Sequence, residues 1–162
     1  MNNEEIKVQS DQGYYLGVKL IKARKAWRIN GSAIVYDMNR MVQHDDVVDE
    51  GYEVEYPDGY KSFSPKDVFE KAYYQILDPT KISEGDVLGF MKQRYSLRLG
   101  EKTTVVLDTT ITGFDTIGTS ACVNPNNYDH AIGEGIARRD IKDKIWGHLG
   151  FVLQWAINGL KR

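Results

Sequence analysis

Apolar and polar residues alternate in two short runs in the first half of the chain. Residues 52–56 and 60–64 each alternate, and Pro57-Asp58-Gly59 stands between them. An Asp-Gly pair supplies the positive φ values that a tight turn needs, so the pattern predicts a β-hairpin. Upstream, residues 14–29 alternate more loosely with lysines and predict an edge-like strand, whereas residues 32–41 fit a strand and a helix equally well.

A helix is predicted directly after the hairpin. In Ser64-Pro65-Lys66-Asp67, the serine can cap the open N–H groups, proline fits the first helical position, and aspartate suits the first turn. Apolar residues then recur at helical spacing over about three turns until Asp78-Pro79 ends the helix. These residues are Val68, Phe69, Ala72, Tyr73 and Ile76. Residues 78–86 are rich in Pro, Ser, Gly and Asp and predict a linker.

The second half predicts a helix, a hairpin and two further helices. Residues 84–96 have apolar positions on one helical side, and residues 103–110 are dense in Thr and Val, as in a strand. The turn at 111–113 leads into a second strand over residues 114–123. After it comes a helical stripe, which consists of Ile132, Ile136, Ala137, Ile141 and Ile145. We expect Gly147 or Gly150 to end that helix and a last helix to cover residues 151–160.

The order of these elements predicts an α+β fold, in which antiparallel β-hairpins pack with helices and a C-terminal β-hairpin is followed by two helices. The 162 residues suffice for one domain or two small ones. We expect a β-rich N-terminal segment with a hairpin and a helix over residues 1–80, and a ligand-binding domain over residues 84–162.

Charge and cysteine content exclude several classes of protein. The net charge is −2, from 21 basic and 23 acidic residues, and neither half has the basic stripe of a duplex nucleic-acid binder. The single cysteine, Cys122, rules out an intramolecular disulfide framework and favours a reducing compartment. We find no signal-peptide pattern or membrane-spanning stretch, so a cytoplasmic location without membrane contact is expected.

Catalytic chemistry has little support in the sequence. The cluster His44-Asp45-Asp46 could bind a metal or act as an acid–base pair, but a solvated loop is favoured because no second His or Cys cluster completes the set. His130 and His148 would lie about 27 Å apart on one helix, too far to share a metal. Cys122 lies in a strand with no neighbouring base. We therefore predict no enzyme activity, no catalytic residue, no metal and no cofactor.

Four residues are candidates for ligand binding. Phe114 follows a turn glycine, where an aromatic ring can stack on a flat ligand, and Asn124 offers a carboxamide that can read a base or ribose edge. Arg138 and Arg139 present forks for phosphate. Each has a simpler alternative, since Phe114 could belong to the core, Asn124 could form a turn, and both arginines could be a solvated helix face.

Spacing constrains how Phe114 and Asn124 could act together. They share strand parity, yet ten residues of straight strand would separate them by roughly 33 Å. One small ligand cannot span that distance. Either the chain kinks near Gly118, or a second protomer supplies one of the two residues, as in a symmetric dimer or higher homo-oligomer.

Several motifs in the second half occur together in one known family. The residues are Thr104-Val105-Val106, Gly113-Phe114, Ser120-Ala121-Cys122-Val123, Asn124-Pro125-Asn126-Asn127-Tyr128-Asp129, Gly133, Lys144-Ile145-Trp146 and the run from Gly150 to Leu153. With these motifs, the chain from about Val87 to Gln154 resembles the small tailed-phage proteins called gene-product-49-like. Residues 49–74 also resemble a segment that recurs in phage accessory proteins. Both resemblances imply a phage origin.

A more distant resemblance suggests a function. A hairpin with an aromatic after its glycine and an asparagine ten residues later is similar to the phage anti-Thoeris sponge proteins, the first type of Thoeris anti-defence protein. That resemblance implies sequestration of a cyclic ADP-ribose isomer or cyclic oligonucleotide without cleavage, with Phe114 stacking on adenine, Asn124 hydrogen-bonding the ligand and Arg138 or Arg139 meeting phosphate. The polar loop at 115–117 and residues 1–83 depart from that family.

The function predicted from these observations is an anti-defence sponge for a cyclic nucleotide second messenger in the host bacterial cytoplasm. The alternative is a phage accessory protein that binds and inhibits a host protein through the tyrosine-rich hairpin around Tyr52, Tyr56 and Tyr60. An enzyme built on His44-Asp45-Asp46 is the less favoured possibility, and duplex DNA binding by the last helices is disfavoured by the acidic balance.

Overall fold

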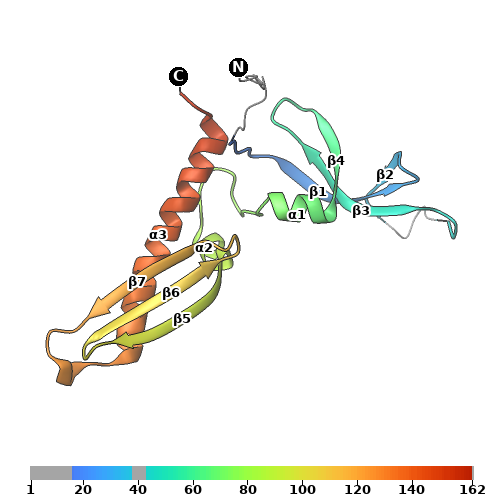
Figure 1. Ribbon diagram of the computed structural model, residues 1–162. Coiled ribbons are helices and arrows are strands. Elements are labelled where there is room, and N and C mark those ends of the chain that lie inside the picture. Colours follow the sequence, from blue (N-terminus) through green and yellow to red (C-terminus); the bar gives the residue numbers. More distant parts are fainter. Residues whose placement is uncertain (1–15, 38–42, 162) are drawn as a thin grey trace, which may run out of the picture.

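The computed structural model describes residues 16–37 and 43–161 and contains two antiparallel sheets, each accompanied by helices (Figure 1). The strands are β1 (Lys22–Ile29), β2 (Ala33–Val35), β3 (Val48–Glu55), β4 (Lys61–Pro65), β5 (Met91–Leu99), β6 (Thr103–Thr110) and β7 (Asp115–Ala121). The helices are α1 (Lys66–Ala72), α2 (Glu84–Phe90), the 3₁₀ turn η1 (Pro125–Asn127) and α3 (His130–Asn158). The predicted α+β class is confirmed.

The first sheet has the strand order β2-β1-β3-β4. The predicted hairpin is present: the Tyr56 N–H donates to the Tyr60 carbonyl at 2.9 Å, and Gly59 adopts φ 83° in the turn. The expectation of an edge strand before Ile29 is wrong, because β1 pairs with β3 along its whole length and with β2 at its end. Residues 14 and 15 of this predicted strand lie outside the described residues. The same holds for residues 38–42 of the run that fits a strand and a helix equally well.

Helix α1 begins directly after β4 but is shorter than predicted. Pro65 occupies the N-cap position, Ser64 lies one residue before it, and Asp67 stands in the first turn. The helix ends at Ala72 and the backbone of Tyr73 is already extended, so the expected third turn is absent. The ring of Phe69 stacks between those of Tyr52 and Tyr73, at centroid distances of 4.0 and 5.0 Å. This aromatic contact joins α1 to the sheet.

The second sheet has the order β5-β6-β7, and its first strand was predicted as helix. Helix α2 ends at Phe90, and residues 91–99 instead pair with β6. The spacing of apolar residues before Tyr95 suits a helix, but β6 offers an unpaired strand edge with hydrogen-bonding groups to satisfy. Tertiary pairing therefore overrides the local helical pattern.

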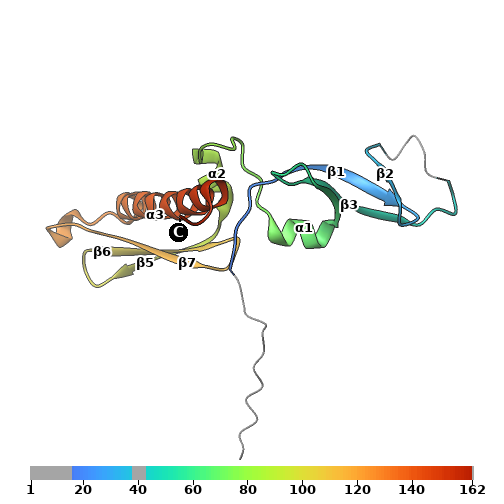
Figure 2. The ribbon, with the colours of Figure 1, turned by 90° about the horizontal axis from the view of Figure 1, so that it is seen from above.

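A single continuous helix, α3, follows the second sheet and crosses one of its faces (Figure 2). The two helices predicted here are therefore wrong, since Gly147 and Gly150 lie inside α3. A glycine inside a helix costs about 1 kcal/mol relative to alanine, which burial of an apolar stripe easily exceeds. The buried stripe consists of Ala137, Ile141, Ile145, Leu149 and Leu153. The core around it also contains Val87 of α2 and Val106 of β6.

Close approach of α3 to the sheet depends on a glycine in β7. A Cβ atom at Gly118 would lie 2.1 Å from the carbonyl oxygen of Ala137 and 2.8 Å from Ile141. Strand β7 is not kinked there, because Gly118 pairs with Val106 in a register that runs unbroken from residue 115 to residue 121. The kink that could have brought Phe114 close to Asn124 is therefore excluded.

The connecting segment predicted as a linker is tied to α2 by one buried carboxylate. Asp86, only 3% exposed, accepts hydrogen bonds from the backbone N–H groups of Leu77 (3.2 Å) and Ser83 (2.7 Å) and from the Ser83 hydroxyl (2.6 Å). The Ser83 hydroxyl in turn accepts from the Asp86 N–H, which completes a capping box at the start of α2. These bonds lower the pKa of Asp86, with the Ser83 side chain as the main cause.

Candidate functional site

A hollow with a basic lining lies beside β5, between α2 and α3. It consists of two adjoining cavities of about 310 and 270 Å³, which share Leu88 and Arg138. The other lining residues are Met91, Lys92, Gln93, Arg94 and Asp108 in the first cavity, and Gly135, Arg139 and Lys142 in the second. We call these residues together the basic hollow. Its first cavity is at the small end of the range usual for ligand pockets.

The register of the sheet aligns three polar residues across the side that faces α3. Arg94 on β5 pairs with Asp108 on β6, and Asp108 pairs with Thr116 on β7. Paired residues of antiparallel strands point to the same face, so the three side chains form a row. Asp108 and Thr116 are buried in the layer between sheet and helix.

This row contains most of the unsatisfied polar atoms in the described part of the chain. Among residues 16–37 and 43–161, three buried side-chain atoms have no hydrogen-bond partner: Asp108 Oδ1, Thr116 Oγ1 and Arg138 Nε. Buried polar groups in proteins are nearly always paired, because leaving one unpaired costs about 1 to 3 kcal/mol. That all three occur where the row meets Arg138 marks this place as unusual.

Two opposing effects act on the ionisation of the Asp108 carboxyl group. Its side chain is only 3% accessible, and burial raises the pKa of its carboxyl group. The positive charges of Arg138 and Arg94 act in the opposite direction and favour the carboxylate. The site thus holds a buried acidic group beside cations that do not hydrogen-bond to it.

Three cations around the basic hollow are free to meet an anion. Arg94 forms an ion pair with Glu134 at 3.1 Å, and Lys142 pairs with Glu84. By contrast, Lys92, Arg138 and Arg139 have no ion pair with any described residue. Chemically, the hollow can accept a phosphate or another anion at its mouth.

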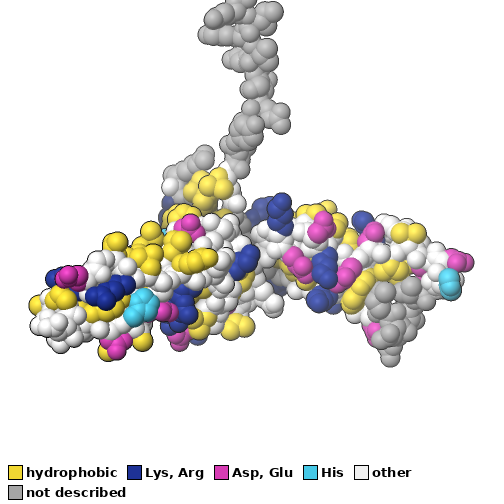
Figure 3. Space-filling model, turned by 60° about the horizontal axis from the view of Figure 1, so that its bottom comes forward, with side chains coloured by type: hydrophobic (Ala, Val, Ile, Leu, Met, Phe, Trp, Pro, Cys, Tyr) yellow, Lys and Arg dark blue, Asp and Glu magenta, His cyan; other side chains and the backbone are white. Residues whose placement is uncertain are grey.

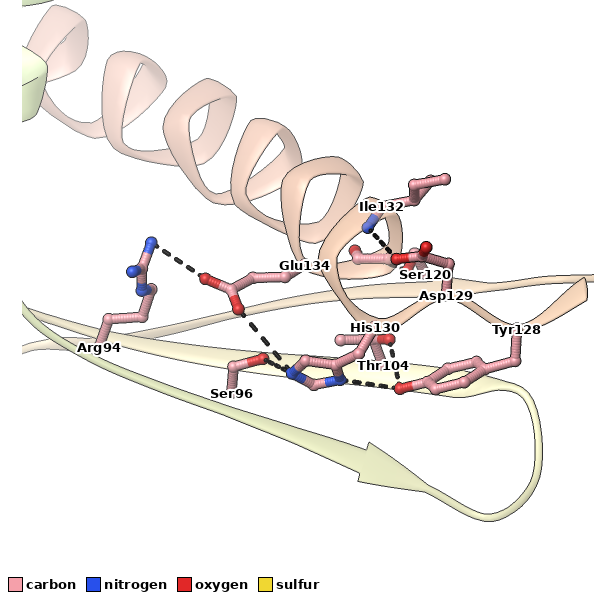
Figure 4. A network of polar contacts seen from close by, with 10 residues as sticks. Arg94, Ser96, Thr104, Ser120, Tyr128, Asp129, His130, Ile132 and Glu134 are labelled. Carbon is pink, nitrogen blue, oxygen red and sulfur yellow. Dashed lines mark hydrogen bonds and ion pairs between the residues drawn. The ribbon is translucent and has the colours of Figure 1, made fainter.

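A polar network runs from the basic hollow along β5 to the start of α3 (Figure 4). One carboxylate oxygen of Glu134 forms the ion pair with Arg94, and the other lies 3.8 Å from His130 Nε2. The same Nε2 contacts the Ser96 hydroxyl at 2.9 Å, and Nδ1 contacts the Tyr128 hydroxyl at 2.8 Å. The network holds Glu134 in place and so orients Arg94 at the rim of the hollow.

At the Tyr128 end of this network, polar contacts connect the start of α3 to the sheet. The Tyr128 hydroxyl lies 3.1 Å from Thr104 Oγ1, and the Arg98 guanidinium lies 4.3 Å from the centre of the Tyr128 ring. Asp129 caps the helix by accepting from the Ile132 N–H at 3.0 Å. These contacts satisfy polar groups and fix geometry, as expected of a supporting structure.

The structure brings together only two of the four predicted site residues. Arg138 and Arg139 both line the basic hollow. Phe114 lies in the β6–β7 turn, 59% exposed, with its ring edge-to-face against His148 at 5.7 Å. Asn124 lies beyond the opposite end of β7, where its carboxamide oxygen accepts from the Asn126 N–H and caps η1. Within one chain, Phe114 and Asn124 therefore cannot meet one small ligand.

The other candidates from the sequence are also located. His44 and Asp45 contact each other at 3.5 Å with fully exposed side chains, while Asp46 accepts hydrogen bonds from Asn30 and Gln43 in a turn. Cys122 is half-buried, and its thiol donates to the Asn124 carbonyl at 3.1 Å. In the part of the chain that the structure describes, no three His, Cys, Asp or Glu side chains are grouped so that they could hold a metal, and no helix is long and apolar enough to cross a membrane.

The tyrosine-rich hairpin is partly committed to internal contacts. Tyr52 stacks on Phe69 and donates a hydrogen bond to Glu70 at 2.9 Å. Tyr56 and Tyr60 stack on each other at 5.8 Å, and Tyr60 is 63% exposed. Only the tip of the hairpin therefore offers an open aromatic surface.

Sequence reasoning missed Asp108, Arg94, Lys92 and Lys142 as members of the hollow. For Asp108 a signal exists, because it has the same strand parity as Val106 in a strand of Thr and Val and so predicts an inward-facing carboxylate. For Arg94 the signal is absent, since that segment was expected to be helical. Its position follows only from the pairing of β5 with β6.

The second sheet has an exposed apolar face on the side away from α3. The register places Tyr95, Leu97 and Leu99 of β5, Val105 and Leu107 of β6, and Ile117 of β7 on this side, which we call the apolar sheet face. Tyr95, Leu97, Leu99 and Ile117 are exposed. Figure 3 shows apolar side chains gathered over this region of the molecule, beside basic, acidic and histidine side chains.

Fold and hollow together define a small α+β protein with free cations around a buried carboxylate. Comparison with known proteins gives the family: the profile of the phage protein (N4 Gp49/phage Sf6 gene 66) family matches residues 66–157. The chain therefore belongs to this phage protein family, which confirms the resemblance noted for residues 87–154. The match starts at Lys66, inside the segment predicted as N-terminal, so α1 belongs to the family region. No curated protein and no solved structure matches the chain.

Proposed function

We propose that this phage protein captures a small phosphate-bearing ligand, a cyclic nucleotide, in the basic hollow and holds it without cleavage in the host cytoplasm. The observation that carries the proposal is the set of three cations that form no ion pair with a described residue, Lys92, Arg138 and Arg139, around the basic hollow. An arginine fork matches the oxygens of a phosphate in two parallel hydrogen bonds. The resemblance to sponge proteins supports sequestration as the purpose of binding.

Sequestration sets a demand on affinity. A protein that removes a messenger stoichiometrically needs a nanomolar dissociation constant, about −12 kcal/mol. Two arginine forks, further cations and partial burial of the ligand can together supply free energy of this size. The Arg94–Glu134 pair also holds one guanidinium in place before the ligand arrives, which reduces the entropy lost on binding.

We also propose that two copies of the chain associate through the apolar sheet face. Asp115 is the only charged residue among the outward positions of β5, β6 and β7 in their paired register, and it is hydrogen-bonded to Thr109 at 2.6 Å. A nearly uncharged face suits a second copy with the same face, since at most one carboxylate of each copy has to be desolvated. Leu97→Lys places one charge per copy at this face, and sedimentation should then show a dimer weakened by about a hundredfold or more. A parent protein that is already monomeric at high concentration contradicts this proposal.

A dimer could also unite Phe114 and Asn124, which one chain keeps apart. If one ligand touches Phe114 of one copy and Asn124 of the other, Phe114→Ala and Asn124→Ala should each weaken binding by about tenfold to a hundredfold. Mixing the two variants then restores one intact site in each mixed dimer. Titration of the mixture should show tight sites that neither variant has alone; their absence would remove these two residues from the site.

The principal experiment is calorimetry with a panel of cyclic nucleotides, followed by denaturation and analysis of the released ligand. Intact ligand is expected, whereas a cleaved product would indicate an enzyme. Arg138→Ala and Arg139→Ala should each weaken binding by about tenfold, and this loss should shrink as salt rises because screening weakens the ionic contribution. Lys71→Ala removes an exposed cation of α1 outside the hollow and serves as the control. If both arginine variants bind like the parent, the hollow is not the site.

The alternative function, inhibition of a host protein, depends on the exposed tip of the tyrosine hairpin. The specific observation in its favour is the open ring of Tyr60, stacked on Tyr56. If no nucleotide binds and Tyr60→Ala abolishes activity in phage infection while Arg138→Ala does not, this alternative replaces the sponge.

A further inference from the structure

One residue of the basic hollow does not fit a site for phosphate alone. Asp108 is 3% exposed and lines the first cavity of the basic hollow, and its Oδ1 has no hydrogen-bond partner among the described residues. A carboxylate repels phosphate, so its presence weakens the binding of a simple anion. A ligand that also brings hydrogen-bond donors would remove this conflict.

The surroundings limit what these donors can belong to. Arg94, Arg138 and Lys92 line the same cavity, so a metal ion or an ammonium group would be repelled there. A neutral group with donors avoids that repulsion. Burial raises the pKa of the Asp108 carboxyl group, and the positive charges of Arg138 and Arg94 oppose this shift without cancelling it. In its ionised form the side chain offers two acceptor oxygens and no donor.

We infer that Asp108 recognises the guanine edge of the ligand, an inference that rests on the function proposed above. Guanine presents N1–H and N2–H₂ side by side, two donors that match the two oxygens of one carboxylate. Adenine presents a donor next to the N1 acceptor, which would face a carboxylate oxygen unfavourably. The phosphate of the same nucleotide then meets Arg138 and Arg139 at the adjoining cavity. The inferred ligand is therefore a guanine-containing cyclic nucleotide rather than a cyclic ADP-ribose isomer.

The test uses two probes that differ in a single amino group, guanosine 3′,5′-cyclic monophosphate and inosine 3′,5′-cyclic monophosphate. The parent should bind the guanosine probe about tenfold more tightly or better, because the amino group adds a hydrogen bond to a charged acceptor. Asp108→Asn, which keeps the size of the side chain, should abolish this preference. Asp115→Asn, on the neighbouring strand but on the opposite face, should retain it and serves as the matched control. Thermal denaturation checks that each variant is folded.

Arg138→Ala separates the two proposals. It should weaken both probes by the same factor, since both carry the same phosphate. If the parent binds both probes equally while Arg138→Ala weakens both, the phosphate site stands and the role of Asp108 is overturned. A preference that survives in Asp108→Asn also overturns it. If neither probe binds to the parent while another cyclic nucleotide of the panel does, the proposed function stands and the guanine inference is overturned. If no cyclic nucleotide of the panel binds, both fail.

Discussion

Asp86 and Asp108 are equally buried, at 3% exposure each, yet their surroundings are opposite. Asp86 accepts hydrogen bonds from two backbone N–H groups and the Ser83 hydroxyl, which hold its pKa below the ordinary value of 3.8. The Oδ1 atom of Asp108 has no hydrogen-bond partner among the described residues, and burial raises the pKa of this carboxyl group above that value. One carboxylate fixes a connection in the fold, and the other is left unsatisfied.

The difference teaches how to separate structural from functional buried charge. A buried carboxylate is tolerated when hydrogen bonds replace the water it loses, as around Asp86. Without them it destabilises the folded protein, and such groups gather where a ligand completes the site. Burial of a carboxylate alone therefore does not distinguish a structural from a functional role. Burial without hydrogen-bond partners, as for Oδ1 of Asp108, indicates a binding site, here the basic hollow.

Removing Asp86 should have the largest effect. Asp86→Ala deletes three charge-assisted hydrogen bonds and half of the capping box, so the free energy of unfolding should fall by about 3 kcal/mol in urea denaturation. Asp67→Ala, at an exposed first-turn position of α1, should cost no more than about 1 kcal/mol. Equal losses of unfolding free energy in the two variants would show that the hydrogen bonds of Asp86 do not stabilise the connecting segment.

The pH dependence of that loss gives the next largest effect. Because folding lowers the pKa of Asp86, its contribution to stability is complete above the unfolded pKa near 3.8 and is lost as pH falls through the lower folded value. The gap between the parent and Asp86→Ala should stay constant from pH 7 to about 5 and narrow in more acidic solution. Denaturation at matched pH values cancels the titration of other groups. A gap that widens in acid contradicts this assignment.

The hydroxyl of Ser83 should matter less than Asp86 but more than a serine without a cap role. Ser83→Ala removes the side-chain cap of α2 and should cost about 1 kcal/mol. Ser64→Ala is the matched control, because Ser64 lies just before α1 without capping it, and should cost less than half of that. Thermal unfolding of both variants measures the difference. Equal effects would mean that the cap of α2 contributes nothing.

Asp108→Asn should have the smallest effect and the opposite sign. A raised pKa in the folded state means that ionised Asp108 destabilises the protein at neutral pH, and this cost disappears as pH falls below the folded pKa towards 3.8. The asparagine variant should be more stable than the parent at pH 7 by up to about 1 kcal/mol, and the advantage should shrink in acid. A clear loss of stability at pH 7 would show that Asp108 has a structural partner.

The fold class, the first hairpin and the β6–β7 hairpin could be predicted from sequence because turn glycines and alternation are local signals. The division of α3 into two helices could not, because burial of Ile145 and Leu149 outweighs the propensity of Gly147. Likewise β5 was mistaken for helix, since its pairing with β6 is a long-range contact that local spacing does not encode.

Of the candidate site, the sequence revealed Arg138 and Arg139 but not their surroundings. The motif Ser83-x-x-Asp86 is a readable capping box that was taken as linker composition. Predicting that Asp108 lines a site requires two facts, the strand parity of β6 and the position of the helix that covers the sheet. The position of that helix follows only from the tertiary fold. Phe114 and Asn124 were correctly judged too distant for one unkinked strand.

The close packing of Gly118 against α3 limits which amino acids this position can accept. Every replacement of Gly118 adds a Cβ atom that would lie 2.1 Å from a backbone oxygen of α3, and backbone cannot rotate away. At Gly147, by contrast, an added Cβ atom would meet nothing within 4 Å. In a library of random variants selected for folded protein, position 118 should therefore keep glycine almost invariably, while position 147 should admit alanine and serine.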